Sequence, residues 1–150
     1  MPPKYRGIPF DELEEGQEWW SPGRTITETD NVMTLAISGD YNPVHSNKEF
    51  AERESTFGKR SPPGYLGIMV MFGFVDRLGI TEGIGRAILN LEWDWEAPVL
   101  IGDTIHARIF VDELKDIGRD DEGIVTYGVE IYNQDEDLVQ EGSFTILADR

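Results

Sequence analysis

Cysteine is absent from the 150-residue chain, so the chain has no disulfide framework, no thiolate metal site and no cysteine nucleophile. Long hydrophobic runs are missing as well. No apolar stretch approaches the roughly 20 residues that a membrane helix needs, and residues 1–15 lack the apolar core of a signal peptide. We therefore expect a cytoplasmic protein that has no membrane partner.

Positive charge is scarce in this chain. Its 13 lysines and arginines face 29 aspartates and glutamates, which gives a net charge of −16 at pH 7. Binding to nucleic acid requires a clustered basic surface, so we expect no nucleic-acid partner. An acidic surface that is poor in lysine is compatible with adaptation to high salt, and also with an ordinary acidic protein.

The remaining composition is that of a folded protein. Hydrophobic residues make up 39% of the chain and aromatic residues 11%, which is enough for a packed core. No internal repeat or low-complexity linker divides the chain. Residues 1–150 are therefore predicted to form a single domain.

Helical patterns dominate the first half of the chain. Thr27 and Asp30 have the spacing of a capping box, and the apolar residues that follow predict a helix over residues 28–38. The apolar residues on the predicted packed face are Val32, Met33, Ala36 and Ile37. Gly39 is a typical helix end, and Asn47 is a suitable N-cap for a short second helix.

The most apolar segment, YLGIMVMFGFVDRL, predicts a buried helix from Gly64 to about Leu78. Gly67 and Gly73 lower its helix propensity by about 1 kcal/mol each relative to alanine. We interpret both glycines as positions where the helix approaches a sheet closely. The segment is shorter than a membrane span, which favours burial in the protein core.

The second half of the chain alternates between apolar and polar residues, which is the pattern of half-buried strands. The alternation predicts strands over residues 87–95, 105–111, 125–131 and 138–147, and residues 17–26 could supply one more. The short connections favour antiparallel pairing. The predicted fold class is α+β, with one long helix packed against an antiparallel sheet.

The segment SGDYNPVH places Asp40 five residues before His45, in a predicted loop. Pro43 restricts the backbone, so the loop can turn back and bring the two side chains together. A carboxylate beside an imidazole suits general acid–base catalysis, although the same residue types are also common in polar turns. A metal site would need further ligands, and the second histidine, His106, is predicted on the polar face of a distant strand.

The span LAISGDYNPVHSNKEFA, residues 35–51, resembles the hydratase signature of the MaoC-like family, which includes the (R)-specific enoyl-CoA hydratases. The signature consists of a small residue, GD, any residue, NP, an aliphatic residue, H, five residues and a small residue. Every fixed position is matched. The segments SPGRTITETD at 21–30 and APVLIGDTI at 97–105 are similar to other parts of the family.

The resemblance implies a hotdog fold, in which the sheet wraps around the helix at 64–78, and a homodimer. It also implies a lyase that adds water reversibly across the 2,3 double bond of a trans-2-enoyl-CoA thioester without a cofactor. By motif position, Asp40 and His45 would hold the water and exchange protons. Asn42 would brace the loop or the histidine ring at the substrate site.

Two residues at the start of the central helix complete the predicted site. Gly64 permits close approach of the backbone, so its N–H group is a candidate donor to the thioester oxygen. Tyr65 is a candidate substrate contact in the acyl tunnel. The family commonly has a His-Gly pair where this chain has Pro63 and Gly64.

Two other functions stay open. Hotdog folds also host thioesterases, and the departure at Pro63 is compatible with a non-catalytic subunit that binds acyl thioesters. The thioester could be carried by CoA or by an acyl carrier protein, and the acidic surface favours CoA. Its phosphates would require a local basic rim, for which Lys59, Arg60 and Arg86 are candidates.

Overall fold

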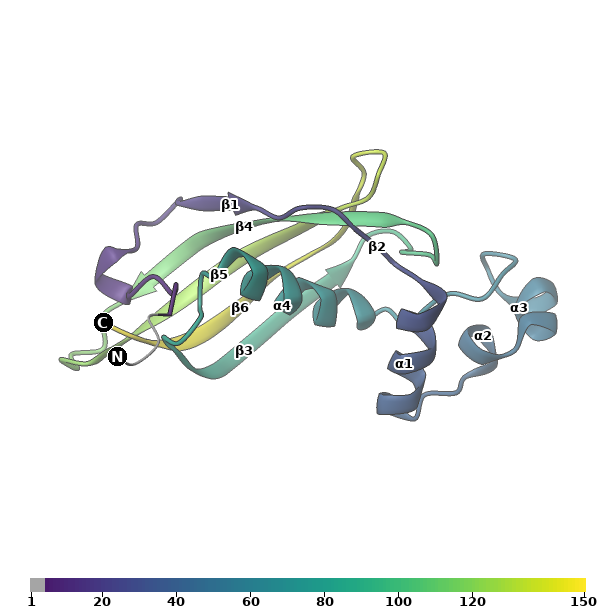
Figure 1. The fold of residues 1–150 in the computed structure, drawn as a ribbon, viewed down its shortest axis with the longest axis horizontal. Helices are drawn as coiled ribbons and strands as arrows, with labels where there is room; N and C mark the ends of the chain where they lie inside the picture. The colour runs from purple at the N-terminus through teal and green to yellow at the C-terminus, as the bar shows by residue number, and fades with distance from the viewer. Residues whose placement is uncertain (1–4) are drawn as a thin grey trace.

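Six strands form one antiparallel sheet in the computed structural model, which describes residues 5–150 (Figure 1). Five strands lie in the order β1–β4–β5–β6–β3, and β2 also pairs with β4. The strands are β1 (Glu18–Trp20), β2 (Arg24–Thr25), β3 (Gly85–Trp95), β4 (Thr104–Lys115), β5 (Glu122–Tyr132) and β6 (Leu138–Asp149). This sheet confirms the α+β class, and the segment predicted as a fifth strand supplies both β1 and β2.

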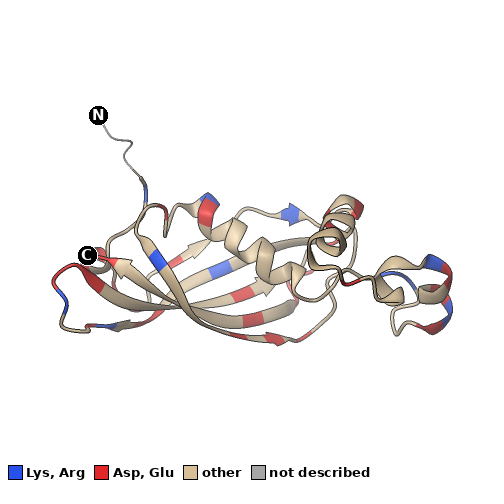
Figure 2. Cartoon of the chain, turned by 90° about the horizontal axis from the view of Figure 1, so that it is seen from below, with Lys and Arg blue, Asp and Glu red and all other residues tan. Residues whose placement is uncertain are grey.

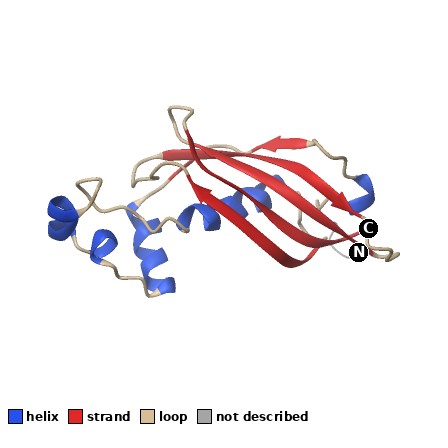
Figure 3. Ribbon diagram, turned by 180° about the vertical axis from the view of Figure 1, so that it is seen from behind, coloured by secondary structure: helices blue, strands red, loops and turns tan. Residues whose placement is uncertain are grey.

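The helices are divided between one face of the sheet and one end of it. The long helix α4 runs along a face of the sheet, whereas α1, α2 and α3 lie together beyond its end (Figures 1 and 3). The helices are α1 (Glu28–Ser38), α2 (Pro43–Ser46), α3 (Lys48–Glu54) and α4 (Leu66–Leu78), preceded by a short 3-10 helix η1 (Phe10–Glu12). Asn47 caps α3 as the sequence predicts, through its side-chain oxygen and the Phe50 N–H group.

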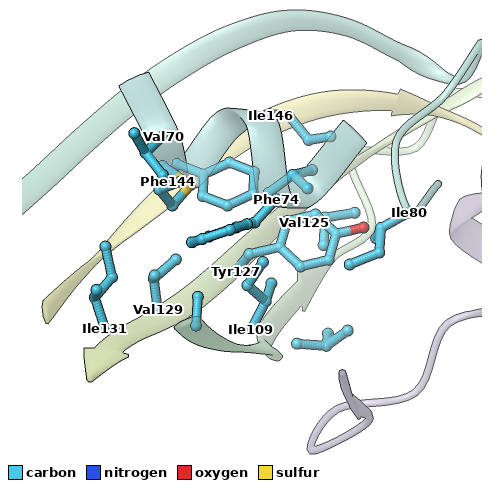
Figure 4. Close-up of a cluster of buried hydrophobic side chains, with 14 of the residues drawn as sticks. Val70, Phe74, Ile80, Ile109, Val125, Tyr127, Val129, Ile131, Phe144 and Ile146 are labelled. Atoms are coloured by element: carbon cyan, nitrogen blue, oxygen red, sulfur yellow. The ribbon is translucent and has the colours of Figure 1, made fainter. Parts of the chain in front are cut away.

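The hydrophobic core lies between α4 and the sheet. Phe74 of α4 lies near the rings of Tyr127 and Phe144, which stack with their centroids 5.0 Å apart (Figure 4). The alternation predicted for residues 105–111 of β4 and 125–131 of β5 is confirmed, because every second residue of these ranges is buried. The buried residues of this set are Ile105, Ala107, Ile109, Val111, Val125, Tyr127, Val129 and Ile131.

The start of α4 and its two glycines differ in part from the sequence prediction. The helix begins at Leu66 and not at Gly64, because the preceding residues form a turn in which the Leu66 N–H donates to the Pro63 carbonyl. A Cβ atom at Gly67 would lie only 2.0 Å from Gln140 Oε1, so this glycine does permit close approach to the sheet. Gly73 has no neighbour within 4 Å of such an atom, and the prediction of close approach is wrong there.

Helix α1 has the predicted ends but packs by a different face. Thr27 and Asp30 form the capping box, and Gly39 ends the helix with a left-handed φ of 72°. The apolar face predicted to be packed is exposed instead, with Met33 57% and Ile37 74% accessible. The reason is its position, because α1 lies beyond the sheet and only one side of it meets the chain. The residues that α1 buries are Asn31, Thr34 and Leu35.

Strand β3 also differs from the half-buried strand that its alternation predicts. Among the strands of residues 5–150, it pairs only with β6 and forms an edge of the sheet. Irregular pairing between Ile88 and Asn90 interrupts the alternation. Leu89 and Trp95 are 51% and 53% exposed, so an apolar edge faces outward.

Two properties bear on function. Within residues 5–150, no helix is both long and apolar enough to cross a bilayer. The same residues contain no group of three or more histidines and carboxylates arranged to hold a metal ion.

Removing the hydroxyl of Tyr127 is expected to stabilise the protein. This hydroxyl is buried without a hydrogen-bond partner among the described residues, and burial raises the pKa of Tyr127, so the side chain stays neutral. Because an unpaired buried hydroxyl is unfavourable, Tyr127→Phe should raise the free energy of unfolding by about 1 kcal/mol. Denaturant unfolding measures the change. Tyr132→Phe, which loses a hydrogen bond to Glu130, is the control and should not be stabilised.

Candidate active site

Asp40 and His45 are brought together by the junction of α1 and α2. Asp40 comes directly after the glycine that ends α1. Asn42 then caps α2, accepting a hydrogen bond from the Val44 N–H at 3.4 Å, and Pro43 takes the first helical position. His45 therefore lies on a short helix, whereas the sequence predicts a loop. Its Nε2 atom is 3.9 Å from Asp40 Oδ2.

A main-chain carbonyl group fixes the tautomer of His45. The Nδ1 atom lies 2.6 Å from the carbonyl oxygen of Ser61, which can only accept, so Nδ1 carries the hydrogen. In the neutral ring Nε2 then has a free lone pair. The side chain is 15% exposed, and the His45 carbonyl accepts from Asn31 Nδ2. His45 can thus act as a proton acceptor at the atom that faces Asp40.

The Asp40 carboxylate has a donor on each oxygen. Oδ1 accepts from the Asn42 N–H at 3.3 Å, and Oδ2 accepts from the Tyr65 hydroxyl at 3.1 Å. Oδ2 is also the oxygen that faces His45 Nε2. Their 3.9 Å separation is too long for a direct hydrogen bond and short enough for one water molecule to contact both atoms.

Gly64 lies in the turn that opens α4. Its carbonyl oxygen accepts hydrogen bonds from Trp95 Nε1 at 2.9 Å and Gln140 Nε2 at 3.5 Å. A Cβ atom at this position would lie 2.8 Å from Trp95 Nε1, so the contact depends on glycine. The Gly64 N–H donates no hydrogen bond within residues 5–150. It lies near the positive end of the α4 dipole, where it is suited to an anionic oxygen.

A cavity of about 530 Å³ lies beside these groups. His45, Ser61 and Gly64 border it, and much of its wall is apolar, including Phe57 and Leu66. Pockets of this kind suit a largely apolar ligand that a few polar groups orient. Asp40 and Tyr65 do not line the cavity, although Tyr65 lies between two residues that do.

The candidate basic residues differ in their surroundings. Arg60 forms an ion pair with Glu28 at 2.8 Å, and Lys59 is exposed in the same loop, which borders the cavity. Acidic residues are interspersed with basic ones along the chain at this end of the molecule (Figure 2). Arg86 pairs with Asp149 and borders a different cavity.

His106 takes no part in the site. It lies on β4, where its ring stacks against Tyr132 with centroids 5.8 Å apart, and its Nε2 is 3.5 Å from Glu136. Its side chain is 21% exposed, so aromatic neighbours cover much of the residue that the sequence predicts on a polar face.

Three groups of the site were not indicated by the sequence. Ser61 contributes a carbonyl oxygen, which every residue possesses, so no sequence signal could identify it. Trp95 and Gln140 reach Gly64 from β3 and β6, and only the strand pairing brings them there. Trp95 and Gly64 are 31 positions apart in the sequence, and both residue types are common in such an interval, so the sequence gives no signal for the contact.

Comparison with known proteins identifies the family. The sequence profile of the MaoC like domain matches residues 13–133. The chain belongs to the MaoC-like family. This MaoC-like protein is 34% identical over 107 residues to the (R)-specific enoyl-CoA hydratase of Rhodospirillum rubrum, with 70% of each chain covered. It is 32% identical over 115 residues to the 3-hydroxybutyryl-CoA dehydratase of Methylorubrum extorquens, covering 76% of this chain and 70% of that one.

Solved structures confirm the hotdog fold of this MaoC-like protein. It superposes on the monoamine oxidase regulatory protein of Archaeoglobus fulgidus with a TM-score of 0.83 and 31% identity, covering 96% and 95% of the two chains. The R-hydratase PhaJ1 of Pseudomonas aeruginosa gives a TM-score of 0.78 at 27% identity, covering 95% and 86%. A Mycobacterium tuberculosis protein with a double hotdog fold gives 0.78 at 19% identity, covering 96% and 44%.

Proposed function

We propose that the protein is an (R)-specific hydratase and dehydratase that adds water reversibly to trans-2-enoyl-CoA thioesters. The observation that carries the proposal is the pair of acceptors, Asp40 Oδ2 and His45 Nε2, held 3.9 Å apart next to a cavity with apolar walls. Membership of the MaoC-like family and the similarity to an (R)-specific enoyl-CoA hydratase support this class of reaction.

The two acceptors define how a water molecule would be held. A water between Asp40 Oδ2 and His45 Nε2 donates one hydrogen to each, which leaves a lone pair of its oxygen free to attack the β-carbon. As the C–O bond forms, one of the two acceptors takes a proton from the water. The same proton is then delivered to the α-carbon, so that H and OH add across the double bond and both groups return to their starting states. Positioned proton transfer of this kind contributes about 10²- to 10⁴-fold in rate.

The Gly64 N–H group would stabilise the charge that develops during the attack. Negative charge grows on the thioester oxygen, and a fixed N–H donor at a helix N-terminus is suited to stabilise that charge. The peptide that carries this N–H is oriented by the hydrogen bond from Leu66 N–H to the Pro63 carbonyl. Pro63 thus takes part in the turn that presents the donor.

Hydration of crotonyl-CoA tests the proposal. The purified protein should lower the absorbance of the enoyl thioester, and chiral analysis should identify (R)-3-hydroxybutyryl-CoA. Release of the free thiol would indicate a thioesterase, and no turnover over a series of acyl chain lengths would indicate a non-catalytic binding subunit. The same acyl group on a carrier protein should give a lower kcat/KM, because a chain of net charge −16 repels an acidic carrier.

We also propose that two copies pair through their β3 edges to form a homodimer. β3 is hydrogen-bonded to β6 on one side only, and Ile88, Leu89 and Trp95 are each at least half exposed. An unpaired edge with apolar side chains is a template for another strand, and a patch of this kind marks an interaction surface. A second copy of β3 would satisfy the free backbone groups and cover these side chains.

A lysine at the β3 edge is expected to dissociate the dimer. Leu89→Lys would bury a charge between the copies and should weaken the dimer at least about tenfold in Kd. Light scattering after size-exclusion chromatography measures the mass at several concentrations. Trp20→Lys on β1, at the opposite edge and 50% exposed, is the control and should leave the mass unchanged. If Leu89→Lys stays dimeric at all concentrations, the interface lies elsewhere.

A further inference from the structure

The Tyr65 side chain is directed at Asp40 and away from the cavity. Its hydroxyl oxygen lies 3.1 Å from Asp40 Oδ2 and 2.9 Å from Ser38 Oγ. Gly64 and Leu66, on either side of it in the chain, both line the cavity, whereas Tyr65 does not. This arrangement does not suit the substrate contact that the sequence predicts for this residue.

The single hydroxyl hydrogen of Tyr65 has two possible acceptors. An ionised carboxylate oxygen accepts more strongly than a neutral hydroxyl oxygen, so the hydrogen is directed at Asp40 Oδ2. Ser38 Oγ is the other acceptor, and it has no hydrogen left to donate to the phenol oxygen, because its hydrogen goes to the Thr34 carbonyl. Its own hydroxyl lies 2.7 Å from the Thr34 carbonyl and accepts from the Asp40 N–H at 3.1 Å. The chain of contacts connects α1, Asp40 and the turn before α4.

We propose that Tyr65 is the positioning residue of the acid–base pair and acts through Asp40 without touching the substrate. The Asp40 side chain is 37% exposed, and its other oxygen is held only by the longer 3.3 Å contact from Asn42 N–H. Tyr65 donates to Oδ2, the Asp40 oxygen that faces His45. It therefore fixes the distance between Asp40 Oδ2 and His45 Nε2, between which a water molecule would be held. The kinetic part of this inference rests on the proposed hydratase function.

Tyr65→Phe keeps the ring and removes the donor. We expect kcat for crotonyl-CoA to fall about 10- to 100-fold, because hydrogen bonds to charged groups are worth factors of this size, while KM changes less than about twofold. Tyr41→Phe is the matched control: Tyr41 lies one residue after Asp40, is 60% exposed, and its hydroxyl has no partner among the described residues. A raised KM with unchanged kcat would identify Tyr65 as a substrate contact and overturn the proposal.

A second measurement does not depend on activity. Tyr65 and His45 are the titratable groups that face the Asp40 carboxylate within residues 5–150, and they compete for Oδ2. The NMR chemical shift of the His45 Nε2 atom at a fixed pH should therefore change in Tyr65→Phe, with the His106 ring signals unchanged as the internal control. Thermal unfolding confirms that the variant is folded.

The two measurements separate this inference from the proposed function. If the wild-type protein hydrates crotonyl-CoA but Tyr65→Phe changes neither kcat nor the chemical shift of His45 Nε2, the positioning role is wrong and the hydratase proposal stands. If the wild-type protein hydrates no enoyl-CoA but the chemical shift of His45 Nε2 changes in Tyr65→Phe, the hydratase proposal fails and the positioning role is supported.

Discussion

Asp40→Asn and His45→Gln are each expected to lower kcat for enoyl-CoA hydration by about 10²- to 10⁴-fold. Either change leaves one proton-accepting group where the proposed mechanism needs two, because the amide side chain of Asn or Gln cannot take a proton from water at neutral pH. The loss should appear in kcat and kcat/KM together, because substrate binding in the apolar cavity is retained. Steady-state kinetics with crotonyl-CoA measures both constants.

The fold should survive these changes. Asp40 is partly exposed, and an amide at position 45 can still donate to the Ser61 carbonyl, so the melting temperature should change by no more than about 4 °C. Matched controls are Asp120→Asn, in an exposed turn, and His106→Gln, on β4, which should retain full activity. If His45→Gln unfolds the protein, His45 has a structural role and the catalytic assignment weakens. Full activity in either variant would refute the acid–base pair.

Met71→Ala is expected to lower the free energy of unfolding by about 2–5 kcal/mol, the largest effect on stability that we predict. Met71 is fully buried between α4 and the sheet, so the truncated side chain leaves a cavity that the surrounding residues fill only in part. Chemical denaturation followed by circular dichroism measures the change.

The control for this prediction is the same substitution on the opposite face of the helix. Met69 is 46% exposed and two residues away, so Met69→Ala should change stability by no more than about 1 kcal/mol. The pair also tests which face of α4 meets the sheet. The sequence alone describes a helix that is apolar nearly all round, and equal effects of the two substitutions would mean that both faces are buried.

Local sequence patterns predicted correctly the strands whose apolar faces are covered by other parts of the same chain. The capping box at Thr27 specifies where α1 begins, and the alternation of β4 and β5 specifies both the strands and the face that each buries. The same patterns failed for α1 and β3, where Ile37 and Leu89 are apolar but exposed. A sequence pattern shows that a face is apolar and does not show what covers it. Within residues 5–150, no helix or strand covers either face.

The residues of the candidate site also fall into those that the sequence could predict and those that it could not. Asp40 and His45 were predictable as a pair because both belong to one short motif whose spacing limits the backbone. The role of Tyr65 was not predictable, because the direction of its ring depends on the turn between Pro63 and Leu66. The Ser61 carbonyl could not be predicted at all, since the contact requires backbone geometry and no particular side chain.

That Ser61 contact has a consequence for how the protein can evolve. The Ser61 N–H donates to the Val44 carbonyl, and the Ser61 carbonyl accepts from the His45 ring. Ser61 therefore makes both bonds with main-chain atoms and neither with its side chain. Ser61 also borders the cavity. Substitutions of its side chain can therefore reshape the cavity while the histidine keeps its proton on the same nitrogen. Under the proposed function, substitutions at position 61 could change the substrate range without a change in the acid–base chemistry, so selection could diversify one and keep the other.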